Sequence, residues 1–132
     1  MIFIDTGPLL ARYHKLDQNH KEALRAWDAL EKSQAIYVTT NLVLSEMFTL
    51  MGRRMGYAFA AERARAIYGS KKMAVLRPTE DDERQAIELM EKFADQRVGF
   101  VDCVSFAMMR RRKIQTVFSF DRHFAFAGFK LL

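Results

Sequence analysis

Short apolar runs recur along the chain, separated by longer segments in which apolar residues return every three or four positions. The runs cover residues 1–4, 36–39, 74–76, 116–120 and 129–132. Apolar runs without internal alternation are typical of strands buried on both faces of a parallel sheet. We therefore predict four strands and, in the run at the end of the chain, a fifth.

Helical periodicity fills the segments between these strands. The predicted helices cover residues 8–13, about 17–30, 41–55, 57–68, 79–93 and 100–112. Thr79 precedes four acidic residues, which favours a helix start because a hydroxyl caps the first amides and the helix dipole stabilises acids there. The element order is β-α-α-β-α-α-β-α-α-β-β. Such an order implies crossover connections, and it predicts an α/β fold whose mainly parallel sheet is flanked by helices.

Length and composition predict one folded domain over residues 1–132. Half of the residues are hydrophobic, which suits a chain with a substantial core. The single cysteine, Cys103, excludes an intrachain disulfide and favours a reducing compartment, and its apolar surroundings indicate a buried thiol rather than a nucleophile. We see no targeting segment and no stretch long enough to span a bilayer, so we expect a cytoplasmic protein without membrane contact. The net charge of +5 permits a nucleic-acid partner.

Two of the predicted strands end in an aspartate. Asp5 follows the first apolar run, and Asp121 follows the run at residues 116–120. In a parallel sheet the carboxyl ends of the strands share one edge, where ligands bind in open α/β folds. We therefore expect these two side chains to lie close together. The alternative for Asp121 is a cap on the turn or short helix that follows.

Two further carboxylates stand in apolar helical surroundings. Glu46 shares the apolar stripe of its helix, near the end that enters from the same sheet edge. Asp102 is the one charged residue between Val98 and Met109. A buried carboxylate is normally paired, protonated or bound to a metal. The alternatives are a glutamate at the rim of the core and an aspartate that serves the first helical turn.

Four carboxylates that meet at one edge repel one another unless a cation neutralises them. Hard oxygen ligands without clustered cysteine or histidine favour Mg²⁺ or Mn²⁺ over zinc. The histidines His14, His20 and His123 are scattered, and we predict a helix start for His20 and a surface or loop position for His123. Because His123 and Arg122 flank Asp121, a substrate contact is the alternative for these two residues. A metal held by carboxylates suits phosphodiester hydrolysis, because it activates water and stabilises the developing charge.

Four ordered segments resemble the acidic motifs of PIN-domain ribonucleases. They are IDTG at residues 4–7, TTN at 39–41 leading to Glu46, FVD at 100–102, and FSFDRHF at 118–124. The likeness spans nearly the whole chain and is greatest to the toxins of VapBC-type toxin–antitoxin pairs. It implies a PIN-like three-layer fold, Mg²⁺- or Mn²⁺-dependent endoribonuclease activity on RNA, a homodimer, and a cognate antitoxin protein.

The resemblance also implies roles for individual residues. Asp5, Asp102, Asp121 and Glu46 match the acidic quartet that binds metal and carries catalysis, with Glu46 acting directly or through water. Thr6 and Ser119 match the hydroxyl residues that accompany the first and last aspartates. Gly99 departs from the pattern, since many relatives carry a polar residue near that position.

Three other functions are alternatives to this prediction. A phosphoacceptor receiver domain needs an acidic pair beside its phosphoacceptor and a lysine at the end of a late strand, whereas Asp5 stands alone and the late strand ends in Asp121. A haloacid-dehalogenase-type phosphatase needs a second aspartate two residues after its nucleophile, where this chain has Gly7. The remaining alternative is a PIN-like module that binds RNA or protein without significant cleavage.

Overall fold

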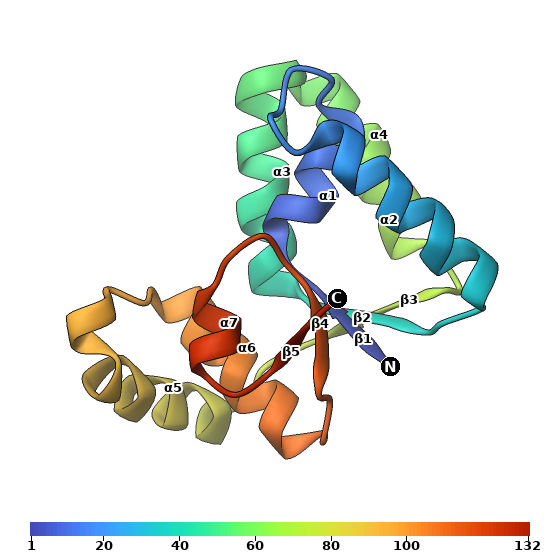
Figure 1. Ribbon diagram of the computed structural model, residues 1–132. Helices are drawn as coiled ribbons and strands as arrows, with labels where there is room; N and C mark the ends of the chain where they lie inside the picture. The colour runs from blue at the N-terminus through green and yellow to red at the C-terminus, as the bar shows by residue number, and fades with distance from the viewer.

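A five-stranded sheet in which all strands run parallel forms the centre of the fold (Figure 1). The computed structural model describes all residues from Met1 to Leu132. The strands are β1 (Ile2–Ile4), β2 (Tyr37–Thr40), β3 (Met73–Leu76), β4 (Thr116–Phe118) and β5 (Lys130–Leu131), in the order β3-β2-β1-β4-β5. The predicted parallel α/β sheet is confirmed, with its fifth strand formed by the last apolar run.

Every connection between consecutive strands contains at least one helix, and the last connection, from β4 to β5, contains only the short helix α7. The helices are α1 (Thr6–Tyr13), α2 (His20–Ser33), α3 (Asn41–Met55), α4 (Tyr57–Tyr68), α5 (Glu80–Lys92), α6 (Phe100–Arg111) and α7 (His123–Phe126), with a 3-10 turn at Ala94–Gln96. The helix predicted from residue 8 begins two residues earlier, directly after Asp5. The sequence pattern does not predict α7, because four residues carry little more than one helical turn. No helix has the length and apolar character needed to cross a membrane.

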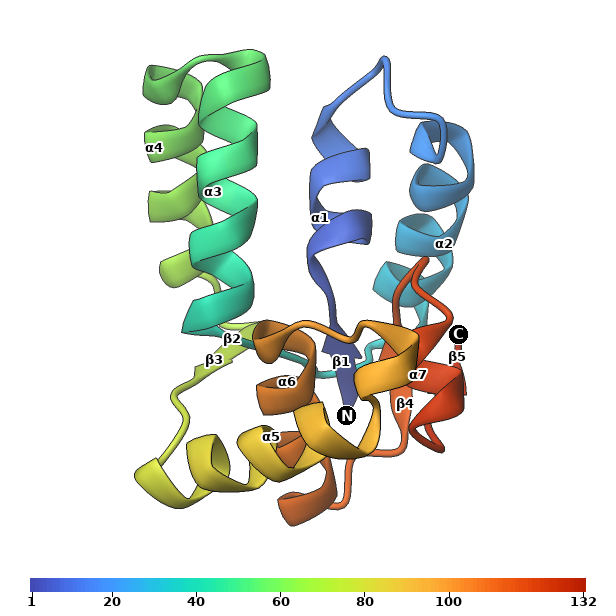
Figure 2. The ribbon, with the colours of Figure 1, turned by 90° about the vertical axis from the view of Figure 1, so that its left-hand side faces the viewer.

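The helices form two layers around the sheet. Helices α1 to α4 lie on one side and α5 to α7 on the other (Figures 1 and 2). On the second side Phe106 packs edge-on against Phe124, with ring centroids 5.0 Å apart, and both side chains are fully buried. Cys103 is also fully buried, as predicted. The predicted three-layer architecture is therefore confirmed.

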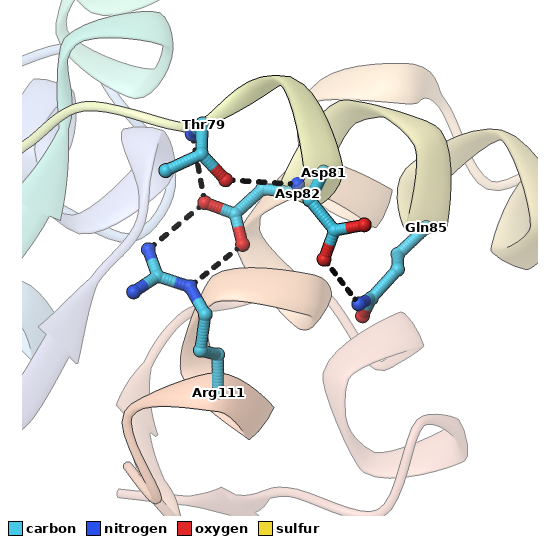
Figure 3. Close-up of polar contacts among 5 residues, drawn as sticks. All are labelled: Thr79, Asp81, Asp82, Gln85 and Arg111. Carbon is cyan, nitrogen blue, oxygen red and sulfur yellow. Dashed lines mark hydrogen bonds and ion pairs between the residues drawn. The ribbon is translucent and has the colours of Figure 1, made fainter.

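An ion pair between a buried aspartate and a partly exposed arginine fastens α6 to the start of α5 (Figure 3). Asp82 is fully buried and accepts two hydrogen bonds from Arg111, from Nε at 2.8 Å and from Nη2 at 2.9 Å. It also completes the predicted cap of α5, since it accepts from the Thr79 amide while the Thr79 hydroxyl accepts from the Asp82 amide. The Arg111 hydrogen bonds hold the pKa of Asp82 below its usual value. This clamp fixes the carboxyl end of the helix that carries Asp102.

Candidate active site

A cleft of about 720 Å³ opens beyond the carboxyl ends of β1 and β4. The twelve residues that line it are mostly polar, and they are Asp5, Thr6, Gly7, Leu10, Asp17, Glu46, Leu50, Arg54, Asp102, Phe120, Asp121 and Arg122. The four carboxylates of the predicted site thus line one cleft, although they come from separate parts of the chain. Their catalytic and metal-binding roles stay a prediction.

Asp5 is placed by the pairing of β1 with β4. Ile4 lies opposite Phe118 in the sheet, and the Asp5 amide donates to the Phe118 carbonyl at 3.1 Å. The Ser119 hydroxyl, at the end of β4, donates to Asp5 Oδ2 at 2.7 Å. Asp5 is only 8% exposed, and burial raises its pKa to about 6 despite the hydrogen bond from Ser119. Ser119 therefore orients this carboxylate and stabilises its ionised form.

Asp102 lies in the first turn of α6 and faces the other acids. Burial raises its pKa to about 7, and the charges of Asp5, Asp121 and Glu46 add to the shift. An aspartate that served mainly the helix dipole would have a lowered pKa, because the positive end of the dipole stabilises its charge. The first-turn explanation therefore does not account for the raised pKa of Asp102, whereas burial together with the neighbouring carboxylates does.

Asp121 both caps the chain that follows and faces the cleft. Its amide donates to the Ser119 hydroxyl at 2.9 Å, and its Oδ1 accepts from the His123 amide at 2.9 Å. The alternative that Asp121 caps the turn that follows is therefore correct for its Oδ1 atom. The same residue also raises the pKa values of Asp5 and Asp102 by its negative charge, which places it within electrostatic reach of both.

His123 lies closer to the acids than the sequence indicated. We predicted a surface or loop position, but His123 begins α7 and its side chain is only 29% exposed. Its Nδ1 lies 3.1 Å from Asp121 Oδ1 without hydrogen-bond geometry, and that nitrogen is buried. Ligand atoms of Asp102, Asp121 and His123 all lie within 4.8 Å of one another. The spacing Asp-x-His across a helix start was the available signal.

Glu46 reaches the cleft from α3. The Thr40 hydroxyl accepts from the Val43 amide at 3.1 Å and so fixes where α3 begins. Glu46 follows in the second turn, exposed rather than packed at the rim of the core. Its charge contributes to the raised pKa values of Asp5 and Asp102. Because it is the exposed member of the quartet, Glu46 can adjust its position to a ligand or a water molecule.

The donor set fits a divalent cation. Burial, with the charges of the neighbouring carboxylates added to it, raises the pKa values of Asp5 and Asp102, and a bound cation would offset the cost of ionising them. The buried Nδ1 of His123 has no hydrogen-bond partner and stands beside Asp121, so one imidazole donor is also within reach. Oxygen donors with a single histidine are typical of sites for hard divalent ions rather than zinc.

Comparison with known proteins agrees with this geometry. The PIN domain family model matches residues 2–130. The chain is 39% identical over 129 residues to the 23S rRNA-specific endonuclease VapC20 of Mycobacterium tuberculosis, covering 98% of this chain and 95% of that protein. It is 25% identical to ribonuclease VapC26 of the same organism over 126 residues, which is 94% of this chain and 90% of VapC26.

The fold also matches that of a solved structure of the same relative, VapC20. The crystal structure of M. tuberculosis VapC20, described as a Sarcin-Ricin loop cleaving toxin, superposes with a TM-score of 0.88 at 37% sequence identity. The match covers 98% of this chain and 96% of that one. The resemblance that the four acidic motifs indicated is therefore confirmed, and the chain belongs to the PIN-domain family, alongside VapC endoribonuclease toxins.

Proposed function

We propose that residues 1–132 act as one PIN-like domain that hydrolyses RNA phosphodiester bonds with Mg²⁺ or Mn²⁺, as the toxin of a toxin–antitoxin pair. The observation that carries this proposal is the cleft in which Asp5, Glu46, Asp102 and Asp121 meet. Two of these acids have strongly raised pKa values, and such perturbed groups concentrate at functional sites. Two relatives with endonuclease or ribonuclease names support the same activity.

The residues divide into ligands and supports. Asp5, Asp102 and Asp121 would hold the metal, and Glu46 would act directly or through water. When bound, a divalent ion lowers the pKa of water and stabilises negative charge on the attacking and leaving oxygens. Ser119 holds the Asp5 carboxylate in place by its 2.7 Å hydrogen bond. Thr6 begins α1 directly behind Asp5 and is buried, so it keeps this wall of the cleft in position.

We infer ribosomal RNA as the substrate class. VapC20 is named a 23S rRNA-specific endonuclease and a Sarcin-Ricin loop cleaving toxin, and its chain aligns with this one over nearly the full length. Hydrolysis adds water across one P–O bond, leaving a phosphate on one fragment and a hydroxyl on the other. Family membership further supports a cognate antitoxin and a homodimer. The exposed Tyr57 and Tyr68 of α4 are available for such protein contacts.

The proposal is tested by incubating the purified protein with a synthetic sarcin–ricin stem-loop RNA. We expect one internal cut in Mn²⁺ or Mg²⁺, none in EDTA, and none with a folded Asp5→Asn variant. The Asp95→Asn variant, altered at an exposed aspartate outside the cleft, is the matched control and should cut normally. Binding of the RNA without any cut in either metal would instead support a PIN-like binding module, and cutting that survives EDTA would exclude the metal mechanism.

A further inference from the structure

Two arginines line the otherwise acidic cleft, and neither is paired. Arg54 and Arg122 are both exposed and both line the cleft with the four acids. Other arginines of the chain are held by carboxylates, namely Arg12, Arg63, Arg84 and Arg111. No ion pair or side-chain hydrogen bond of the structure occupies the guanidinium groups of Arg54 and Arg122. They are therefore free to bind an anion.

Arg54 stands on the face of α3 that carries Glu46. Glu46, Leu50 and Arg54 follow one another at intervals of four residues, which places them on one helical face. Eight residues of helix rise about 12 Å, so Arg54 lies one to two nucleotide lengths along the cleft from Glu46. Arg122 directly follows Asp121, beyond β4. Arg54 comes from α3, which follows β2, and Arg122 comes from the turn after β4. The strand that leads to Asp5, β1, lies between β2 and β4.

A second hollow of about 440 Å³ lies beside the cleft along α3. The two hollows share Glu46 and Leu50, so these two residues stand between them. The second hollow is also lined by Ser45, Thr49 and Arg53. The Thr49 hydroxyl already donates to the Ser45 carbonyl at 2.9 Å, which leaves the Ser45 hydroxyl and the Arg53 guanidinium as donors suited to a phosphodiester backbone.

The negative charge of the cleft would repel RNA phosphates unless cationic side chains offset it. Five carboxylates line it, namely Asp17 and the acidic quartet, and they repel an approaching polyanion. Arg54 and Arg122 are the cations among the lining residues. A guanidinium presents paired N–H donors that match two phosphate oxygens, which an ammonium group does not do. Two arginines that flank the acids would thus hold the phosphates on either side of the bond that is cut.

We propose that Arg54 and Arg122 are substrate-positioning residues that bind RNA phosphates on the two sides of the cleaved bond, with Arg53 extending the same track along α3. This inference rests on the proposed RNA cleavage function. It goes beyond that function by assigning the path of the RNA: a single-stranded segment crosses the acidic cleft and follows the exposed face of α3. The acids then act on the phosphate between the two guanidinium groups.

The test measures RNA binding separately from cleavage. A fluorescein-labelled sarcin–ricin stem-loop RNA is titrated with the Asp5→Asn protein in Mg²⁺ over a series of KCl concentrations. The same titration is made with Arg54→Gln, Arg122→Gln or Arg25→Gln added to that background. Arg25 is the matched control, since it is exposed on α2, outside both hollows and in no ion pair. All four proteins should keep the same melting temperature within a few degrees.

We expect Arg54→Gln and Arg122→Gln each to weaken binding about five- to tenfold and to reduce the slope of log affinity against log salt by about 0.7. In the otherwise wild-type protein each change should raise KM while kcat stays within about twofold. The Arg25→Gln change should leave affinity and slope unaltered.

The outcomes separate the two proposals. Arginine variants that bind with the affinity and salt slope of the Arg25→Gln control would overturn the phosphate assignment, even if the wild type cuts RNA normally. Arginine-dependent binding by a wild-type protein that never cuts RNA would support the assignment and reject the proposed activity. A loss of kcat with unchanged KM would also contradict a positioning role, because it would place these arginines in the chemical step.

Discussion

Replacing Asp5 with asparagine should stabilise the metal-free protein. Asp5 has a pKa near 6 in the folded state against an ordinary 3.8, and burial is the largest cause. Between about pH 4 and 6 the folded state therefore binds more protons than the unfolded state, so stability falls as the pH rises through that window. A shift of two units corresponds to about 3 kcal/mol at pH 8. Asparagine avoids this cost and can still accept the hydrogen bond from Ser119.

The measurement is urea unfolding in EDTA at pH 5 and at pH 8. We expect Asp5→Asn to exceed the wild type by about 3 kcal/mol at pH 8 and by about half as much at pH 5, where Asp5 is mostly protonated in the folded state. At pH 8 the gain corresponds to about 10 °C in melting temperature. The exposed Asp95→Asn control should change stability by less than about 0.5 kcal/mol at either pH.

Saturating Mn²⁺ should reverse the order of stability. The ion binds the folded wild type and adds about 4.1 kcal/mol at a thousandfold excess over its dissociation constant, which exceeds the advantage of about 3 kcal/mol of the variant, whereas the variant lacks one of the ligands. A metal-free Asp5→Asn protein that is less stable than the wild type at pH 8 would refute the reasoning. It would mean that the contacts of the ionised carboxylate outweigh the cost of its burial.

Three further substitutions test the supports of the site. Arg111→Ala should lower the free energy of unfolding, measured in urea, by about 2 kcal/mol, because it leaves the buried Asp82 of α5 without its guanidinium partner. The control Arg112→Ala, at an exposed arginine, should change the free energy of unfolding by less than about 0.5 kcal/mol. Ser119→Ala should weaken Mn²⁺ binding about tenfold in calorimetric titration, since it removes the hydrogen bond that orients the first aspartate; equal affinity would contradict this role. Phe124→Ala should cost about 3 to 4 kcal/mol by opening a cavity in the aromatic core, whereas Phe126→Ala, at a residue 63% exposed, should cost less than 1 kcal/mol by the same assay.

The parallel sheet could be predicted because its three central strands, β1, β2 and β4, are short and mostly buried. Runs such as Tyr37–Thr40, in which every residue is buried, have a composition that differs sharply from the amphipathic helices around them. The acids of the cleft could also be predicted, because they stand in or directly after apolar stretches of the sequence. Asp102 stands alone in an apolar helix, and a charge in such surroundings needs an explanation that packing cannot supply.

The parts that the sequence did not reveal depend on contacts between distant residues. Arg111 belongs to the basic run at residues 110–113, and nothing in that run indicates its ion pair with Asp82, 29 residues away. Arg54 is one of two adjacent arginines near the end of α3, and only the assembled fold places it in the cleft. His123 is similar, because its approach to Asp102 depends on how α6 and α7 pack.

The most direct test of the account is the rate at which the purified protein cuts the sarcin–ricin stem-loop RNA as Mn²⁺ is titrated from an EDTA-treated state. The wild type should show no cleavage without metal and a saturable rise with it. A folded Asp102→Asn variant should remain at least a hundredfold slower at every Mn²⁺ concentration, because it lacks a carboxylate from the centre of the cleft. Equal rates for the two proteins, or a wild-type rate that is independent of metal, would contradict the claim that this acidic cleft is a metal-dependent ribonuclease site.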